Sequence, residues 1–123
     1  MRKLLPKPRA GGTWTESRYW SFIRSNLRRF WLKWPVRGQV LNKSKRPSQL
    51  TDKRTKFEYQ CAMCKSWNKG KNVQVDHITP CGSLKKPSDL ARFVTTLFCE
   101  EDNLRVLCKT CHHTVTQEER NKK

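Results

Sequence analysis

The second half of the chain carries two short cysteine pairs, Cys61-Ala62-Met63-Cys64 and Cys108-Lys109-Thr110-Cys111. Two intervening residues let both thiolates of a pair bind one tetrahedral ion, and four thiolates fill the coordination shell of Zn²⁺. We therefore predict a structural zinc site whose ligands are Cys61, Cys64, Cys108 and Cys111. A closed shell leaves no position for water, so we expect this ion to stabilise the fold without catalysing a reaction.

The competing interpretation of the cysteine pairs is a redox-active dithiol. One Cys-x-x-Cys would serve that purpose, and no thioredoxin-like βαβ pattern surrounds either pair. The stretch between the pairs is longer than in most zinc ribbons, which predicts an element inserted between them. Cys81 and Cys99 do not stand at ligand spacing, so we expect them to be small, buried side chains.

Short elements of secondary structure are predicted around the cysteine pairs. Alternating residues indicate strands over 72–75 and 104–107. We expect one helix to open at Pro87 and a final helix to run from about residue 112 to residue 120. The core-facing positions of the helix after Pro87 are Leu90, Phe93, Val94, Leu97 and Phe98. The fold class that these elements predict is α+β.

An aromatic-rich helix is predicted before the cysteine pairs. Thr13 and Glu16 have the spacing of a capping box. We expect Pro35 to stop the helix, because the residue before a proline disfavours helical geometry. Apolar residues recur at three- and four-residue steps and fall within an arc of about 100°, the width of a buried stripe. These residues are Trp20, Ile23, Leu27, Phe30, Trp31 and Trp34, whereas Phe22 and Leu32 lie off the stripe.

Cations surround the remainder of this helix, at Arg18, Arg24, Arg28, Arg29 and Lys33. We expect the apolar stripe to dock on the core and the cationic face to contact the phosphates of a nucleic acid. The alternative for the cations is a solvated face. Both functions fit on one helix, since the stripe and the arginines lie on different sides.

The chain has 123 residues and a formal net charge of +17, from 27 Lys and Arg against 10 Asp and Glu. Such an excess implies a polyanionic partner, and we prefer nucleic acid to anionic lipid because no lipidation signal is present. A merely solubilising surface is the alternative. No apolar run reaches the roughly 18 residues of a membrane-spanning helix, and the N-terminus lacks the apolar stretch of a signal peptide. We therefore expect a cytoplasmic protein.

Three segments are predicted along the chain: a flexible basic arm over 1–12, a basic helix and linker over 13–56, and a domain over 57–123. The linker part, 36–56, is polar and basic, shows no sustained periodicity, and is expected to hold at most one short helix. Its cations would follow a phosphate backbone.

Three further sites in the last segment carry acid–base or ligand chemistry: Asp76-His77, Asn103 and His112. With the cysteines they form the order Cys-x2-Cys, Asp-His-Ile-x-Pro and Asn-Leu-x-x-Leu-Cys-x2-Cys-His. This order resembles the HNH endonucleases of the ββα-metal superfamily over about residues 57–120. The matching residues are Cys61, Cys64, Asp76, His77, Ile78, Pro80, Asn103, Leu104, Leu107, Cys108, Cys111 and His112. Residues 18–29 are similar to the leader of small phage-encoded HNH proteins.

The resemblance implies a ββα-metal (HNH) nuclease core, stapled by the four-cysteine zinc site and preceded by the basic helix. It implies that His77 is the general base and that Asp76 and His112 hold a catalytic divalent ion, Mg²⁺ or Mn²⁺, with Ni²⁺ or Zn²⁺ as alternatives. Asn103 would orient His77. His113 follows His112 directly, so the register of that ligand is open, and His112 is chosen because it follows the second cysteine pair as in the family.

The expected function is therefore metal-dependent endonuclease cleavage of DNA, in the host cytoplasm if the chain is phage-encoded, with a phage or host protein as a further partner. Phosphate contacts position a protein without reading bases, so we expect salt-sensitive binding with little sequence discrimination. The runner-up is a non-catalytic, zinc-stabilised nucleic-acid-binding module. A basic structural or membrane-surface protein is the third hypothesis, and it leaves the cysteine pairs unexplained.

Overall fold

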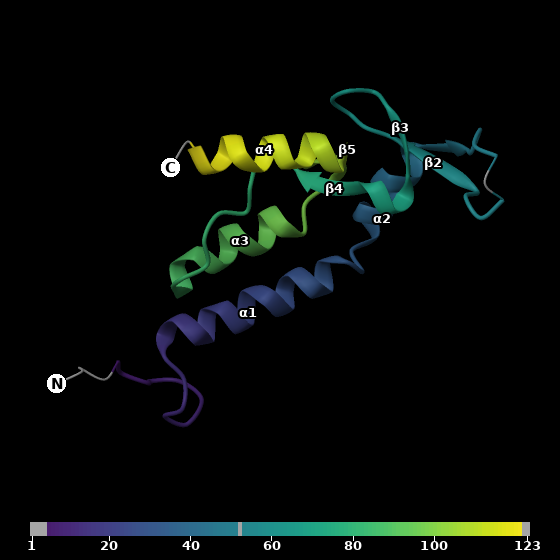
Figure 1. Cartoon of the computed structure of the whole chain (residues 1–123). Helices are drawn as coiled ribbons and strands as arrows, with labels where there is room; N and C mark the ends of the chain where they lie inside the picture. The colour runs from purple at the N-terminus through teal and green to yellow at the C-terminus, as the bar shows by residue number, and fades with distance from the viewer. Residues whose placement is uncertain (1–4, 52, 122–123) are drawn as a thin grey trace. The chain divides into compact units, whose positions relative to one another are not determined.

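The computed structural model of the chain describes residues 5–51 and 53–121. Residues 1–4 of the expected arm, residue 52 of the expected linker and residues 122–123 at the chain end lie outside the described residues. The architecture is α+β, with short helices and two small antiparallel sheets (Figure 1). The chain forms two compact units. Unit 1 comprises Met1–Trp34 and Thr79–Phe98, and unit 2 comprises Pro35–Ile78 and Cys99–Lys123.

Unit 1 contains the long helix α1 (Glu16–Trp31) and the short helix α3 (Leu90–Leu97), which follows the 3-10 turn η2 (Pro87–Asp89). The apolar faces of the two helices share one core, whose buried members are Trp20, Cys81, Leu84, Phe93 and Leu97. Partly buried side chains complete it: Tyr19, Ile23, Leu27, Trp31 and Phe98. Cys81 is thus a small buried side chain, as predicted. Phe93 and Leu97 of the expected helix face the core, also as predicted.

The start of α1 differs from the prediction. Thr15, not Thr13, is the N-cap, and its hydroxyl accepts a hydrogen bond from the amide of Arg18 at 3.1 Å. Thr13 instead donates to the carbonyl of Ala10, within a turn over residues 9–14. The carboxylate of Glu16 accepts hydrogen bonds from Arg9 and from the indole of Trp20. The capping-box interpretation is wrong for two reasons. Glu16 is the first residue of the helix and not the third, and its carboxylate bonds two side chains instead of the backbone N–H of the N-cap.

The apolar stripe of α1 packs as predicted at its centre but not at its edge. Trp34, beyond the end of the helix, contacts Phe98 edge-to-face at 5.6 Å between ring centroids. Phe30 is 59% exposed, so its expected place in the core is wrong. It lies at the rim of the 100° arc and is not among the residues packed against the core. Leu90, at the first turn of α3, is also exposed.

Unit 2 is built on a hairpin of β4 (Val73–His77) and β5 (Leu104–Cys108), continued directly by α4 (Lys109–Asn121). The predicted strands are confirmed, and the final helix starts three residues earlier than expected. The pairing is antiparallel, with Val75 opposite Val106 and Asp76 opposite Arg105. Figure 1 shows α4 running beside this hairpin.

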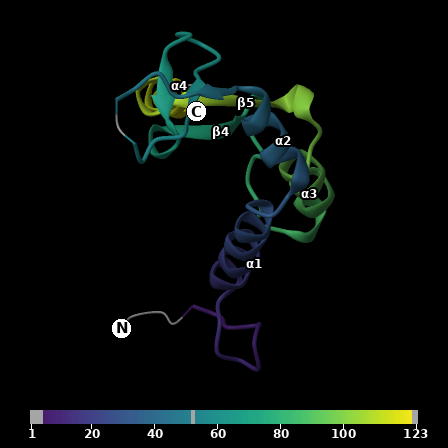
Figure 2. The same cartoon turned by 90° about the vertical axis from the view of Figure 1, so that its right-hand side faces the viewer.

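Residues 36–51 and 53–56 hold more secondary structure than expected of a linker. Pro35 is the first residue of α2 (Pro35–Lys43), a position where its missing N–H is harmless, and α2 contacts β4 and β5 (Figure 2). The strand β1 (Lys45–Pro47) then pairs with β2 (Phe57–Gln60), which pairs with β3 (Trp67–Lys69). The sequence lacked a periodic signal here because β1 is only three residues long.

Alternation along the hairpin assigns its side chains to two faces. Opposite residues of an antiparallel pair share a face, so Asp76, Arg105 and Leu107 lie on one side. That side faces α4, since Leu107 packs in one cluster with Val115 of α4. The other face includes the buried Val75 and Val106. Two short 3-10 turns precede the strands, η1 (Gly70–Asn72) before β4 and η3 (Glu101–Asn103) before β5. None of the described helices is both long and apolar enough to cross a membrane.

Candidate functional site

The four predicted metal ligands come together in unit 2. The sulfur atoms of Cys61, Cys64, Cys108 and Cys111 all lie within 4.8 Å of one another. Those of Cys64 and Cys108, on different segments of the chain, are 3.8 Å apart. Zn–S bonds of about 2.3 Å in a tetrahedron place sulfur atoms about 3.8 Å apart, so the cluster fits one ion. The arrangement is consistent with a structural zinc site.

Backbone hydrogen bonds shape the first cysteine pair into a tight turn. The amide of Cys61 donates to the carbonyl of Ser66 at 2.9 Å, and the amide of Lys65 donates to the carbonyl of Cys61 at 3.0 Å. Lys65 has a left-handed backbone with φ of 63°. The amide of Ala62 donates to the carbonyl of Val106 at 2.8 Å, which ties this turn to β5.

The second pair is positioned by regular secondary structure. Cys108 is the last residue of β5, and Cys111 lies in the first turn of α4. An ion bound by both pairs would therefore hold the first turn, the hairpin and α4 at one point. Cys61, Leu107, Cys108 and Val115 also form the buried apolar cluster of this region.

The thiols of the cluster differ in pKa because each has different hydrogen-bond partners. Burial acts to raise the pKa of Cys61, but backbone hydrogen bonds, led by that of Cys108, outweigh it and lower the pKa to about 6. A hydrogen bond with Ser66 lowers the pKa of Cys64. Hydrogen bonding to Cys108, followed by desolvation, raises the pKa of Cys111 to about 12. Four adjacent thiolates repel one another, and a divalent ion bound at this cluster would supply the balancing positive charge.

A second polar cluster lies on the α4 face of the hairpin. The carboxylate of Asp76 accepts a hydrogen bond from Nε of Arg105 through Oδ2, at 3.2 Å. Its other oxygen, Oδ1, is 3.8 Å from Nε2 of His112. The Asp76 side chain is only 13% exposed, so these contacts take place largely away from solvent. His113, the alternative in the sequence, is exposed, which places His112 at the carboxylate.

His77 is the last residue of β4 and pairs with Leu104. The strand thus stays extended through both Asp76 and His77, and alternation directs their side chains to opposite faces. The chain bends only after His77, where the amide of Ile78 donates to the carbonyl of Asn103 at 2.9 Å. The backbone of Asn103 therefore anchors the chain next to His77, at the end of the hairpin.

Arg105 is the member of this cluster that the sequence analysis did not single out. The register of the hairpin would have identified it, because Arg105 lies opposite Asp76 and opposite charges on paired strands attract each other. Finding that register requires the pairing of segments 29 residues apart. Cys99 stays outside both clusters and is half-buried, and burial raises its pKa.

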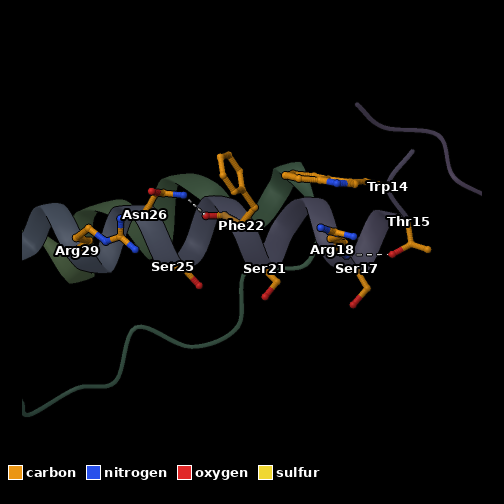
Figure 3. A pocket seen from close by; sticks show the side chains of 9 residues that line it. All are labelled: Trp14, Thr15, Ser17, Arg18, Ser21, Phe22, Ser25, Asn26 and Arg29. Carbon is orange, nitrogen blue, oxygen red and sulfur yellow. Dashed lines mark hydrogen bonds between the residues drawn. The ribbon is translucent and has the colours of Figure 1, made fainter. Parts of the chain in front are cut away.

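The expected nucleic-acid contacts of the N-terminal helix belong to unit 1. Arg18, Arg28 and Arg29 are exposed on α1, as is Lys33 beyond its end, and Arg24 is half-exposed. Arg28 lies 5.6 Å from the ring centroid of Phe93. Arg18 and Arg29 line a groove on the outer face of α1 (Figure 3). The chain thus presents a cationic helix face, as its sequence predicted.

Comparison of the chain with protein-family models, with curated proteins and with solved structures found no match.

Proposed function

We propose that the chain is a divalent-metal-dependent endonuclease of the HNH type that cuts or nicks DNA. The observation that carries this proposal is the approach of the Asp76 carboxylate to the His112 imidazole at 3.8 Å, beside His77 at the end of a hairpin. The hairpin and α4 make a strand–strand–helix arrangement, and the four-cysteine cluster holds it at one end. The motif order described above supports the same assignment.

Asp76 and His112 are the residues that would hold the catalytic ion. Mg²⁺ and related ions keep several waters and take one or two protein ligands together with substrate phosphates, so two side chains are enough. A carboxylate suits Mg²⁺ and Mn²⁺, and an imidazole suits Zn²⁺ and Ni²⁺, so the mixed set leaves all four as candidates. When bound, such an ion neutralises charge on the phosphoryl oxygens and stabilises the departing 3′-oxygen.

His77 would activate the water that attacks phosphorus. A neutral imidazole accepts a proton near neutral pH, which suits a general base. Displacement at phosphorus is in line, so the attacking water and the leaving oxygen lie on opposite sides of the phosphate. His77, the last residue of β4, would reach a phosphate bound at the end of the hairpin, and Asp76 with His112 would hold the ion from the other face of the strand.

Arg105 has a positioning role in this proposal. It engages Oδ2 of Asp76 and leaves Oδ1 directed at His112. Its side chain is 25% exposed, so the guanidinium is also within reach of an incoming phosphate. Asn103 would act through its backbone bond to Ile78, which holds the chain bend beside His77.

A plasmid-relaxation assay with Mg²⁺, Mn²⁺, Ni²⁺ or Zn²⁺ tests the proposal. We expect the parent to nick or linearise supercoiled DNA, and His77→Ala to lose at least a hundredfold in rate, the size of a general-base contribution. His112→Ala should lose activity similarly, whereas His113→Ala, one residue away and exposed, is the matched control and should cut like the parent. If His77→Ala cuts as fast as the parent, the mechanism is wrong.

The second candidate function is a non-catalytic, zinc-stabilised nucleic-acid-binding module. Two observations favour it: the Asp76–Arg105 pair already balances the carboxylate charge, and the cysteine cluster is the only group of three or more close metal-ligating side chains among residues 5–51 and 53–121. Calorimetric titration of Mn²⁺ into the zinc-loaded chain separates the two functions. One bound Mn²⁺ that Asp76→Ala abolishes supports the nuclease, and DNA binding without Mn²⁺ binding or scission supports the module.

A further inference from the structure

An aromatic pair formed by the half-buried Trp14, just before α1, and the exposed Phe22 on α1 lies outside the core of unit 1. Phe22 is 52% exposed and lies about 130° around the helix from the centre of the buried stripe. Its ring contacts that of Trp14 edge-to-face, at 5.1 Å between centroids. A single exposed ring is common on protein surfaces, but Phe22 and Trp14 form a pair that lies together with two arginines in one groove.

The groove around this pair combines aromatic, cationic and hydroxyl groups within a volume of about 630 Å³. Figure 3 shows Trp14 and Phe22 along one edge, three serines along the other, Arg18 between them and Arg29 at the far end beyond Asn26. Its lining residues are Trp14, Thr15, Ser17, Arg18, Ser21, Phe22, Ser25, Asn26 and Arg29, with no acidic side chain among them. The groove therefore offers a positive surface with apolar rings at its edge.

Polar groups in the groove are placed for an anionic chain. The guanidinium of Arg18 lies 4.8 Å from the ring centroid of Trp14, so a group bound to this arginine also meets the ring. The amide nitrogen of Asn26 donates to the carbonyl of Phe22, which leaves the amide oxygen as an acceptor. Arg18 and Arg29 are three helical turns apart, about 16 Å along the axis, or about five stacked nucleotides at 3.4 Å each.

We infer that this groove binds single-stranded nucleic acid, with a base against the Phe22 ring and phosphates at Arg18 and Arg29. A base offers its face to an aromatic side chain only when it is unpaired, whereas a duplex would use the arginines and leave the rings uncovered. An acidic peptide would likewise use the arginines alone. The inference rests on the proposed function only in taking nucleic acid as the partner.

Fluorescence anisotropy of a labelled dT12 strand and of a 12-base-pair duplex tests the inference. The full-length zinc-loaded chain carries His77→Ala throughout, so that cleavage does not interfere. We expect Phe22→Ser to weaken binding of the single strand about fivefold to a hundredfold, the range for one stacked base, and to change duplex binding less than twofold. Arg18→Ser and Arg29→Ser should each lower the single-strand salt slope by about 0.7.

Phe30→Ser is the matched control, because Phe30 is on the same helix, is 59% exposed and does not line the groove. It should leave both affinities unchanged, and the thermal unfolding of both variants should match the parent. The inference is wrong if Phe22→Ser and Phe30→Ser weaken single-strand binding equally, or if Phe22→Ser weakens strand and duplex binding equally. It is also wrong if a poly-glutamate peptide displaces the strand and Phe22→Ser weakens the binding of that peptide. Plasmid cleavage by the parent is scored separately, so Phe22-dependent binding without any cleavage would count against the nuclease alone.

Discussion

The buried side chains of the two units differ in kind, because unit 2 alone, within the part of the chain that the structure describes, contains a cluster of cysteines that could bind a metal ion. Unit 1 has a conventional apolar core, in which Phe93, Leu84 and Leu97 are fully buried. In unit 2 the buried cluster around α4 consists largely of cysteines, with Leu107 and Val115 as its aliphatic members. A chain of 123 residues has little apolar surface to distribute between two cores. The comparison suggests a division of labour: unit 2 also buries Val75 and Val106, and an ion bound by its four cysteines would add to that burial where the candidate catalytic residues lie.

Removal of a metal from the cysteine cluster should therefore have the largest effect, and it should unfold unit 2 while unit 1 stays folded. Structural zinc binding contributes on the order of 10 kcal/mol to folding, more than a small core supplies, so a chelator or Cys108→Ser should unfold the hairpin and α4. Hydrogen exchange should then show loss of protection in β4 and β5, with α1 still protected. Cys99→Ser, a half-buried cysteine outside the cluster, is the matched control and should retain its metal. Unchanged protection of β5 after chelation would contradict the prediction.

Truncation of the largest fully buried side chain of unit 1 should destabilise the chain without loss of its metal. Phe93→Ala removes a fully buried ring from unit 1 and should lower the free energy of unfolding by about 3–5 kcal/mol, measured by urea denaturation. Its zinc content, measured by atomic absorption, should stay at one ion per chain. Leu90→Ala on the same helix should cost less than about 1 kcal/mol, since Leu90 is 39% exposed. Loss of zinc from Phe93→Ala would show that the units do not differ in this way.

The ion pair of Asp76 and Arg105 in unit 2 should contribute less to stability than the metal or the apolar core. Arg105→Gln removes the partner of a carboxylate that is 13% exposed and should destabilise the chain by about 1 kcal/mol. The exposed Arg120→Gln on α4 should cost almost nothing. Chemical denaturation of the zinc-loaded variants measures both. If the two variants are equally stable, Arg105 contributes nothing to the position of Asp76.

The polar pair of unit 1 should have the smallest effect. A hydrogen bond from Arg9, and then one from Trp20, lowers the pKa of Glu16 below its ordinary value of 4.5. The unfolded state thus binds a proton more readily, so this stabilisation is present above about pH 4.5 and is lost as the pH falls through the folded pKa. Melting temperatures of Glu16→Gln and the parent should differ slightly at pH 7 and converge near pH 3. If the difference in melting temperature is larger at pH 3 than at pH 7, the predicted pH dependence has the wrong sign.

Features of the chain that depend on local spacing could be predicted. The four ligands, both hairpin strands and the centre of the α1 stripe follow from residues a few positions apart. The N-cap was misplaced, because Thr13 and Thr15 both precede Glu16 and only the structure shows that Arg9 and Trp20 engage its carboxylate. Helix α2 was anticipated only as a short helix without a position, and strand β1 was missed because it is short and depends on pairing with β2.

By itself, the sequence determined which sulfur atoms could share one ion, since a tetrahedral site requires pairs at that spacing. It also determined the net charge and the apolar face of the first helix. Only the tertiary structure decided that Arg105 lies opposite Asp76, that His112 and not His113 approaches this carboxylate, and that Thr79–Phe98 shares a core with α1. Strand register and the docking of distant segments depend on contacts between residues far apart in the chain, which no local pattern encodes.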